Sequence, residues 1–396
     1  MQESSGHHAR RERGSRVIEA ARPARSARVQ YEAWNRRATP AVEMVREGVW
    51  SIPTAIPDNP LRYVMAYAIA TADGLVLIDT GWDSPESWTD LTDGIDQTGH
   101  TVEDVTDVLL THSHLDHHGL TGRVVERSGA RVHMHALESS SLMALQGASG
   151  RGNGWFTQHG MPEDPATVTE FENHAGYFIA AYTRMKPGDL DLVDRSIPVG
   201  ALPSLRAIWT PGHTAGHMSF LLEDEKLLFS GDHLLPRITP SVNWMSGQLG
   251  NPLGDYLASL ARVAELDADE VLPAHEYRFE GAVERAGQLL LHHSHRLEEI
   301  EDGVDDGATT WQITRAISWS RGWETLTGPM RQMAMSETLA HLEHLVHTVG
   351  HVEHGHALLH QHLGAGGMGF EAPAQLDAGD DQQQRYQKRG NSGLGD

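Results

Sequence analysis

The feature that most constrains this sequence is the cluster His112-Ser-His-Leu-Asp-His117, which directly follows an apolar run at residues 105–110. The apolar run predicts a buried strand, so the cluster falls on the turn at its end. On that turn, His112 and His114 can converge on one point, while Asp116 and His117 face a neighbouring point. With this composition, about 0.01 matches to the motif are expected by chance in the whole chain. The cluster therefore predicts a metal site at a strand end.

The chain contains no cysteine among its 396 residues, which excludes disulfides and thiolate metal sites. Any metal must therefore be held by imidazole and carboxylate groups. The chain has 26 histidines, and neutral imidazole is the commonest ligand for zinc and its neighbours. Most of these histidines are nevertheless expected to have ordinary structural roles.

Apolar periodicity predicts an alternation of strands and helices along most of the chain. We expect strands at residues 42–56, 63–71, 75–79, 105–110, 131–135, 205–209, 218–223, 226–229 and 270–272. Helices are expected at residues 120–128, 255–266 and 281–300, and shorter ones at 309–317, 330–336 and 337–346. A small hairpin is expected at residues 351–356.

Composition divides the chain into four parts. Residues 1–40 are Arg-rich and predict a disordered tail, and residues 41–300 form the expected catalytic domain with an insertion at 139–195. An acidic linker after residue 300 leads to a small helical domain at 305–362, and the Gly, Gln and Asp content of residues 363–396 predicts a second disordered tail.

Three later segments complete a recognisable pattern: Thr210-Pro-Gly-His-Thr-Ala-Gly-His217, Ser230-Gly-Asp-His233 and Pro273-Ala-His-Glu276. Together with the HxHxDH cluster they resemble the ligand segments of the metallo-β-lactamase superfamily. The resemblance implies an α/β fold, a four-layer αββα sandwich with the ligands at strand ends. It also implies an enzyme, a metal-dependent hydrolase.

The same resemblance implies seven ligands for two divalent metal ions. His112, His114 and His213 would bind the first ion. The second would be bound by Asp116, His117 and His275, with Asp232 touching both. Zinc is the expected metal, and manganese or iron suit the same ligands.

Two divalent ions about 3.5 to 4 Å apart lower the pKa of a shared water toward 7, so a metal-bound hydroxide is the expected nucleophile. Asp116 is the expected catalytic residue, orienting the hydroxide and passing its proton to the leaving group, with pure ligation as the alternative. Ile78-Asp-Thr-Gly81 matches the family's early aspartate loop, so Asp79 is expected to support the ligand loop without binding metal. His217 and His233 are expected to have supporting or packing roles.

The C-terminal part suggests one alternative function. The stretch at 337–346 and the following Gly350-His-Val-Glu resemble the helix and wing of the winged-helix domain found in some members of this superfamily, with a core stripe of Leu339, Leu342, Leu345 and Val346. Members with that architecture include lactamase-like endoribonucleases, which makes endoribonuclease activity the runner-up. A single-iron persulfide dioxygenase is a further alternative, whereas His114 disfavours the flavodiiron oxygen reductases, which carry a carboxylate there.

Charge favours a small-molecule substrate over nucleic acid. The net charge is −23, and residues 1–37 carry nine Arg against four Glu, so the remainder is more acidic still and would repel phosphate backbones and membrane surfaces. No signal peptide or apolar run of about 18 residues is recognised, so we expect a cytoplasmic protein. Association of copies through the C-terminal domain is a further expectation.

The insertion is expected to supply the substrate pocket. Its candidate lining residues are Trp155, Phe156, Tyr177 and Tyr182, with ordinary helix packing as the alternative. A thioester, an ester or lactone, or an activated ether would all suit the hydroxide mechanism.

Overall fold

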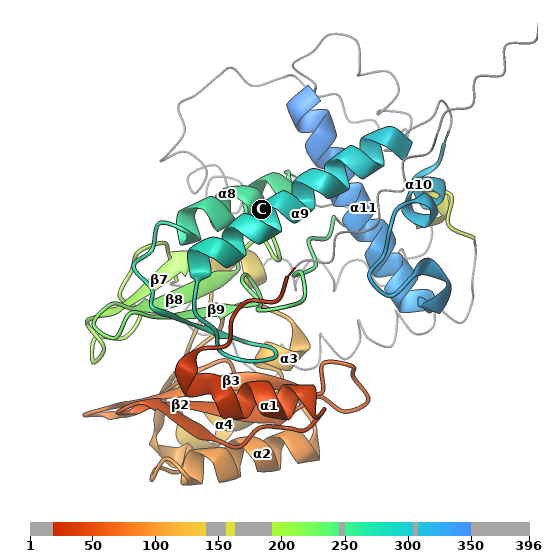
Figure 1. The fold of residues 1–396 in the computed structure, drawn as a ribbon. Helices are drawn as coiled ribbons and strands as arrows, with labels where there is room; N and C mark the ends of the chain where they lie inside the picture. Colours follow the sequence, from red (N-terminus) through yellow and green to blue (C-terminus); the bar gives the residue numbers. More distant parts are fainter. Residues whose placement is uncertain (1–18, 140–155, 163–191, 245–249, 304–307, 350–396) are drawn as a thin grey trace, which may run out of the picture.

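Two β-sheets lie face to face in the protein (Figure 1), whose computed structural model describes residues 19–139, 156–162, 192–244, 250–303 and 308–349. The first sheet has the strand order β1-β2-β3-β4-β5-β6. These strands are β1 (Glu43–Arg46), β2 (Val49–Ala55), β3 (Tyr63–Thr71), β4 (Gly74–Ile78), β5 (Val105–Leu109) and β6 (Arg131–His133). The second sheet has the order β10-β9-β8-β7, with β7 (Leu205–Trp209), β8 (Met218–Leu222), β9 (Leu227–Gly231) and β10 (Glu270–Pro273).

Both sheets are apolar on both faces, which is why their strands are almost completely buried. In β3, alternate residues Met65 and Tyr67 point into the core between the sheets, while Ala66 and Ala68 point to the opposite face. The side chains of strand β9 alternate in the same way. Phe229 points into the core between the sheets, and Leu228 points into the apolar layer on the outer face of the second sheet. This period of two places a hydrophobic layer on each side of each sheet.

Helices cover the two outer faces. Helices α2 (Pro85–Asp96) and α4 (Thr121–Ser128) lie on the first sheet, and α8 (Pro252–Val263) and α9 (Ala282–Gly303) lie on the second (Figure 1). The order helix, sheet, sheet, helix confirms the four-layer αββα sandwich. Among the described helices, none combines the length and apolar character needed to cross a membrane.

The N-terminal segment differs from its prediction. Within the described part of the expected tail, the short helix η1 (Arg25–Ala27) continues into α1 (Arg28–Asn35). The buried Gln30 side chain donates to Ser51 Oγ (2.9 Å) and accepts from the Arg278 amide (3.1 Å), while Trp34 packs edge-on against Tyr63. The Arg-rich composition does not predict this packing. Arg28 itself is exposed and pairs with Glu32 on the same helix. A disordered tail is therefore wrong for this segment.

Most predicted elements agree with the structure, and the differences have local causes. The expected strand at 42–56 is two strands, β1 and β2, because Gly48 has a positive φ of 74° and forms their turn. Helix α2 was not predicted, although Ser84 caps it by accepting from the Ser87 amide. The remaining short elements are η2 (Val102–Asp104) and α3 (Leu115–His118).

The C-terminal region is helical, as expected, but its helices have other bounds. It contains α10 (Thr310–Ala316), η3 (Trp323–Thr325) and α11 (Gly328–Val349), so the two short helices predicted at 330–346 are one continuous helix. Buried Ala340 of α11 joins the apolar layer of α8 and α9, which ties this region to the sandwich. The predicted hairpin at 351–356 and the tail at 363–396 lie outside the described residues.

Candidate metal centre

Strand ends from both sheets meet at one edge of the sandwich and carry the predicted ligands. The HxHxDH cluster follows β5, and the segments that contain His213, Asp232 and His275 follow β7, β9 and β10. Backbone hydrogen bonds join these ends across the sheets: Met218 N donates to Thr111 O (2.7 Å) and Met65 N to Ala274 O (2.7 Å). Ligand segments far apart in sequence are therefore held at one place.

Three imidazoles form the first group. His112 Nε2 lies 2.9 Å from His114 Nδ1, and His213 Nε2 lies 3.0 Å from that same His114 atom and 3.3 Å from His112 Nε2. Three ligand nitrogens at about 2.0 to 2.1 Å from a tetrahedral ion would be about 3.3 Å apart. The triangle of nitrogens thus fits one face of such a coordination shell.

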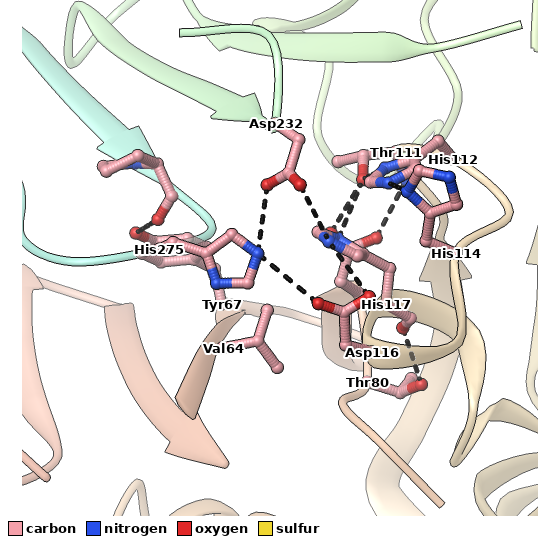
Figure 2. A network of polar contacts seen from close by, with 12 residues as sticks. Val64, Tyr67, Thr80, Thr111, His112, His114, Asp116, His117, Asp232 and His275 are labelled. Carbon is pink, nitrogen blue, oxygen red and sulfur yellow. Dashed lines mark hydrogen bonds and ion pairs between the residues drawn. The ribbon is translucent and has the colours of Figure 1, made fainter. Parts of the chain in front are cut away.

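A second group lies beside the first and shares Asp232 with it. His275 Nε2 is 3.4 Å from Asp116 Oδ2, and His117 Nε2 is 3.8 Å from Asp116 Oδ1. Asp232 Oδ1 faces His275 Nε2 at 3.3 Å, whereas its Oδ2 lies 3.6 Å from His213 Nε2 and 3.7 Å from His117 Nε2. Figure 2 shows Asp232 between the His275 side and the side of His112 and His114. The structure therefore brings together all seven residues predicted as ligands.

In three of the candidate ligands, His112, His213 and His275, the imidazole nitrogen that faces away from the centre has an oxygen partner. Thr111 Oγ1 lies 3.0 Å from His112 Nδ1, and the Ser241 carbonyl lies 2.7 Å from His213 Nδ1. The Tyr63 carbonyl lies 3.3 Å from His275 Nδ1. A carbonyl partner requires a proton on Nδ1, which leaves the lone pair of Nε2 directed into the centre.

Asp79 supports the ligand loop, as expected. Its Oδ1 accepts from the Thr111 amide and its Oδ2 from Thr111 Oγ1, both at 2.8 Å, while Oδ2 also lies 2.7 Å from His117 Nδ1. Asp79 adopts a left-handed backbone (φ 58°), and so does Glu276 directly after His275 (φ 74°). Such conformations cost free energy and concentrate at functional sites.

The surroundings lower the pKa of some imidazoles at the centre and raise the pKa of others. Burial and the adjacent imidazoles lower the pKa of His112 far below its usual range and that of His114 to about 3. Burial acts in the same direction on His275, but Asp232 and Asp116 outweigh it and raise its pKa to about 10; the pKa of His117 is raised by Asp116 and Asp79. The carboxylates therefore favour positive charge at this place, which divalent cations would also supply.

Several buried atoms at the centre are suited to metal binding. Nε2 of His117, Nε2 of His275 and Oδ1 of Asp232 form no hydrogen bond within the described residues, although Nε2 of His275 and Oδ1 of Asp232 lie 3.3 Å apart. Burying such atoms without a hydrogen bond is costly, and an ion would satisfy all three. The two groups contain four and three nitrogen or oxygen donors that could each hold a metal ion. Nitrogen and oxygen donors without a thiolate suit zinc, manganese or iron.

His217, His233 and His133 belong to neither group. The predicted supporting role of His217 agrees with its contacts, since Nδ1 lies 2.8 Å from Thr210 Oγ1 and Nε2 accepts from the Asp232 amide (3.2 Å). His233 is fully buried against Tyr256. His133 pairs with Asp107 (2.9 Å), away from the metal centre.

Of the four predicted pocket residues, the structure describes Phe156. Its side chain is 3% exposed and packs in an apolar cluster with Met335 and Leu339 of α11, so it has the packing role named as the alternative. Trp155, Tyr177 and Tyr182 lie outside the described residues.

Two supporting contacts were missed from the sequence. Glu138 is fully buried and accepts backbone hydrogen bonds from Ser113 and Gly216, which belong to two different ligand segments. The Ser241 carbonyl orients His213. The signal for Glu138 was a lone acidic residue shortly after a predicted strand, which is too common to interpret, and a carbonyl contact leaves no signal in residue type.

The comparison with known proteins agrees with this geometry. Residues 59–275, more than half of the chain, match the family model of the metallo-β-lactamase superfamily. This range contains all seven candidate ligands and both sheets except β1 and β2. The chain therefore belongs to the metallo-β-lactamase superfamily.

Relatives match over most of the chain. Lactamase-like protein adaB from Aspergillus niger is 27% identical over 300 residues, which are 74% of this chain and 71% of that protein. A solved metallo-β-lactamase family protein from Thermus thermophilus is 32% identical, with a TM-score of 0.63 over 77% of this chain and 95% of the other. A β-lactamase domain protein from Burkholderia ambifaria is 27% identical, with a TM-score of 0.67 over 78% and 89%.

Proposed function

We propose that this protein is a binuclear metal-dependent hydrolase that acts on a small molecule containing a thioester, an ester or lactone, or an activated ether. The observation that carries the proposal is the convergence of seven nitrogen and oxygen donors in two adjacent groups that share Asp232. Membership of the metallo-β-lactamase superfamily supports it.

The positions of the seven candidate ligands assign them to two ions. His112, His114 and His213 would hold one ion, and the second group would hold the other. Two divalent ions bound there would polarise the scissile bond and lower the pKa of water toward neutrality. We expect zinc, with manganese and iron as alternatives.

Asp116 is the proposed proton carrier. Its side chain is 19% exposed, compared with 11% for Asp232 and 3% for Asp79, so it is the carboxylate of the centre most open to a substrate. His275 lies 3.4 Å from its Oδ2 and positions it. A carboxylate at this edge could take a proton from water and release it to the leaving group.

Charge separates the small-molecule proposal from the runner-up. The net charge of −23 disfavours a phosphate backbone, so endoribonuclease activity stays the second candidate. A single-iron dioxygenase would need one ion, whereas seven donors in two groups suit two. A cytoplasmic location and association through the C-terminal helices remain predictions.

A substrate panel of thioesters, lactones, phosphodiesters and activated ethers, run beside elemental analysis, tests the proposal. We expect the zinc-loaded wild type to hydrolyse an ester-type compound, and Asp232→Ala and His114→Ala to abolish turnover. Asp116→Asn separates its two roles, because it should retain metal and lose rate if the carboxylate moves a proton. Preferred cleavage of the phosphodiester with strong salt dependence would support the runner-up instead.

A further inference from the structure

Glu138 connects two loops that supply the candidate ligands of the first group. Its Oε2 accepts a hydrogen bond from the Ser113 amide (2.8 Å), and Ser113 lies between His112 and His114. Its Oε1 accepts from the Gly216 amide (2.6 Å), three residues after His213. One carboxylate thus bonds to the segments that carry all three imidazoles.

The burial of Glu138 makes these two bonds important. The side chain is 0% exposed, and a buried carboxylate is costly unless hydrogen bonds compensate its lost hydration. Hydrogen bonds from backbone amides to a carboxylate are stronger than those between neutral groups. Loss of either amide would leave a buried oxygen without that partner, so the carboxylate resists separation of the two loops.

The space around Gly216 shows how closely the second loop lies on this carboxylate. A Cβ atom at Gly216 would lie 2.8 Å from Glu138 Oε1, 2.9 Å from its Cγ and 2.9 Å from its backbone nitrogen. Real Cβ atoms essentially never make contacts this short, so any side chain at this position would push the loop away from Glu138. The glycine is therefore required by the close approach.

The second group has different supports. His117 is held by Asp79 and His275 by the Tyr63 carbonyl, and the two hydrogen bonds of the Glu138 carboxylate go to neither. Asp116 and His117 follow His114 on the same loop, but His117 has the separate support of Asp79, so a change at Glu138 should weaken the first group more than the second.

We infer that Glu138 is a positioning residue that fixes the His112–His114 loop against the His213 loop and thereby sets the affinity of the first group for its metal ion. The inference rests on the proposed metal centre, but not on its hydrolytic activity. It assigns Glu138 no ligand role, because both of its oxygens already accept backbone amides.

The inference is tested by measuring zinc affinity in two variants, each of which keeps only one of the two groups intact. His275→Ala removes a donor of the second group and leaves the first intact, whereas His213→Ala does the reverse. Glu138→Gln is introduced into each, because the carboxamide has one acceptor oxygen and its NH₂ group would oppose the second amide. Zinc affinity is measured by competition with a chromophoric chelator, independently of any substrate.

We expect Glu138→Gln to weaken zinc binding about 10- to 100-fold in the His275→Ala background and less than about threefold in the His213→Ala background. Asp90→Asn is the matched control, because Asp90 also accepts a backbone amide, that of Ala55 (3.0 Å), but on α2. It should change neither affinity.

Gly216→Ala is a second test, because its methyl group would push the loop away from Glu138 while the carboxylate is kept. It should reproduce the selective loss in the His275→Ala background. Equal losses in both backgrounds, or none in either, would overturn the inference while the metal centre stood. A wild-type chain that binds no zinc would contradict the metal centre itself, and the inference with it.

Discussion

The Asp79 carboxylate and the His117 imidazole form a buried pair, with Oδ2 2.7 Å from Nδ1 and both side chains at most 3% exposed. The contact directs Nε2 of His117 toward Asp116 and Asp232 (Figure 2). Asp79, which is not a proposed ligand, therefore determines whether Nε2 of His117 presents a lone pair or a proton to the centre.

Asp79→Asn should weaken binding of the second ion. An amide in place of Oδ2 would donate to Nδ1 and place the imidazole proton on Nε2, where the lone pair is needed. We expect a roughly 10- to 100-fold loss of zinc affinity in a His213→Ala background, measured by chelator competition. Asp107→Asn is the matched control, since Asp107 forms a similar buried pair with His133 away from the centre. An equal loss in the control would contradict the assignment.

Removal of metal should destabilise the fold. Ions that bind only the folded chain stabilise it, and each contributes about 2.7 kcal/mol when its free concentration is 100 times its Kd. We expect a chelator to lower the Tm and restored zinc to raise it again, measured by differential scanning calorimetry. A Tm that does not respond to chelator or zinc would argue against resident ions.

Helix α11 should influence the first group through one loop. Ser336 Oγ donates to the Trp244 carbonyl (2.7 Å), and the same loop provides the Ser241 carbonyl that orients His213. Ser336→Ala should cost about 1 kcal/mol in the free energy of unfolding, measured in urea, and weaken the first ion's binding by less than Glu138→Gln does. Ser128→Ala, which removes a hydroxyl bond within α4, should leave zinc affinity unchanged.

Glu337 of α11 should make stability depend on pH. Burial raises its pKa from 4.5 to about 7, although Arg296 opposes the shift. Because folding raises this pKa, the folded chain binds more protons between pH 4.5 and 7, and stability falls as pH rises through that window. Glu337→Gln should therefore stabilise the protein at pH 8 relative to pH 4.5, by at most about 3 kcal/mol in urea unfolding. The exposed Glu324→Gln should not, and an equal effect there would contradict the prediction.

The candidate ligands were predictable because metal binding restricts residue type and spacing. A cluster such as His112 to His117 is rare by chance, and the segments containing His213, Asp232 and His275 repeat the same restriction. Strands such as β3 were also predictable, since burial on both faces leaves an apolar run.

Contacts made through backbone atoms could not be predicted in the same way. The Ser241 carbonyl would be present with any residue at that position, and Glu138 acts on two amides. Helix α1 was missed because its docking depends on Gln30 and Trp34, which are ordinary residues in an Arg-rich segment. Helix α11 was divided in two because Ser336 and Glu337 interrupt its apolar pattern, although Ser336 bonds to the Trp244 carbonyl and burial raises the pKa of Glu337.

The metal content of the purified protein tests the central claim most directly. After dialysis against zinc and removal of free ions, elemental analysis of the wild type should give close to two ions per chain. His213→Ala and His275→Ala should each give close to one. A folded wild type that retains no metal, or one whose metal content is unchanged by both substitutions, would contradict the binuclear centre.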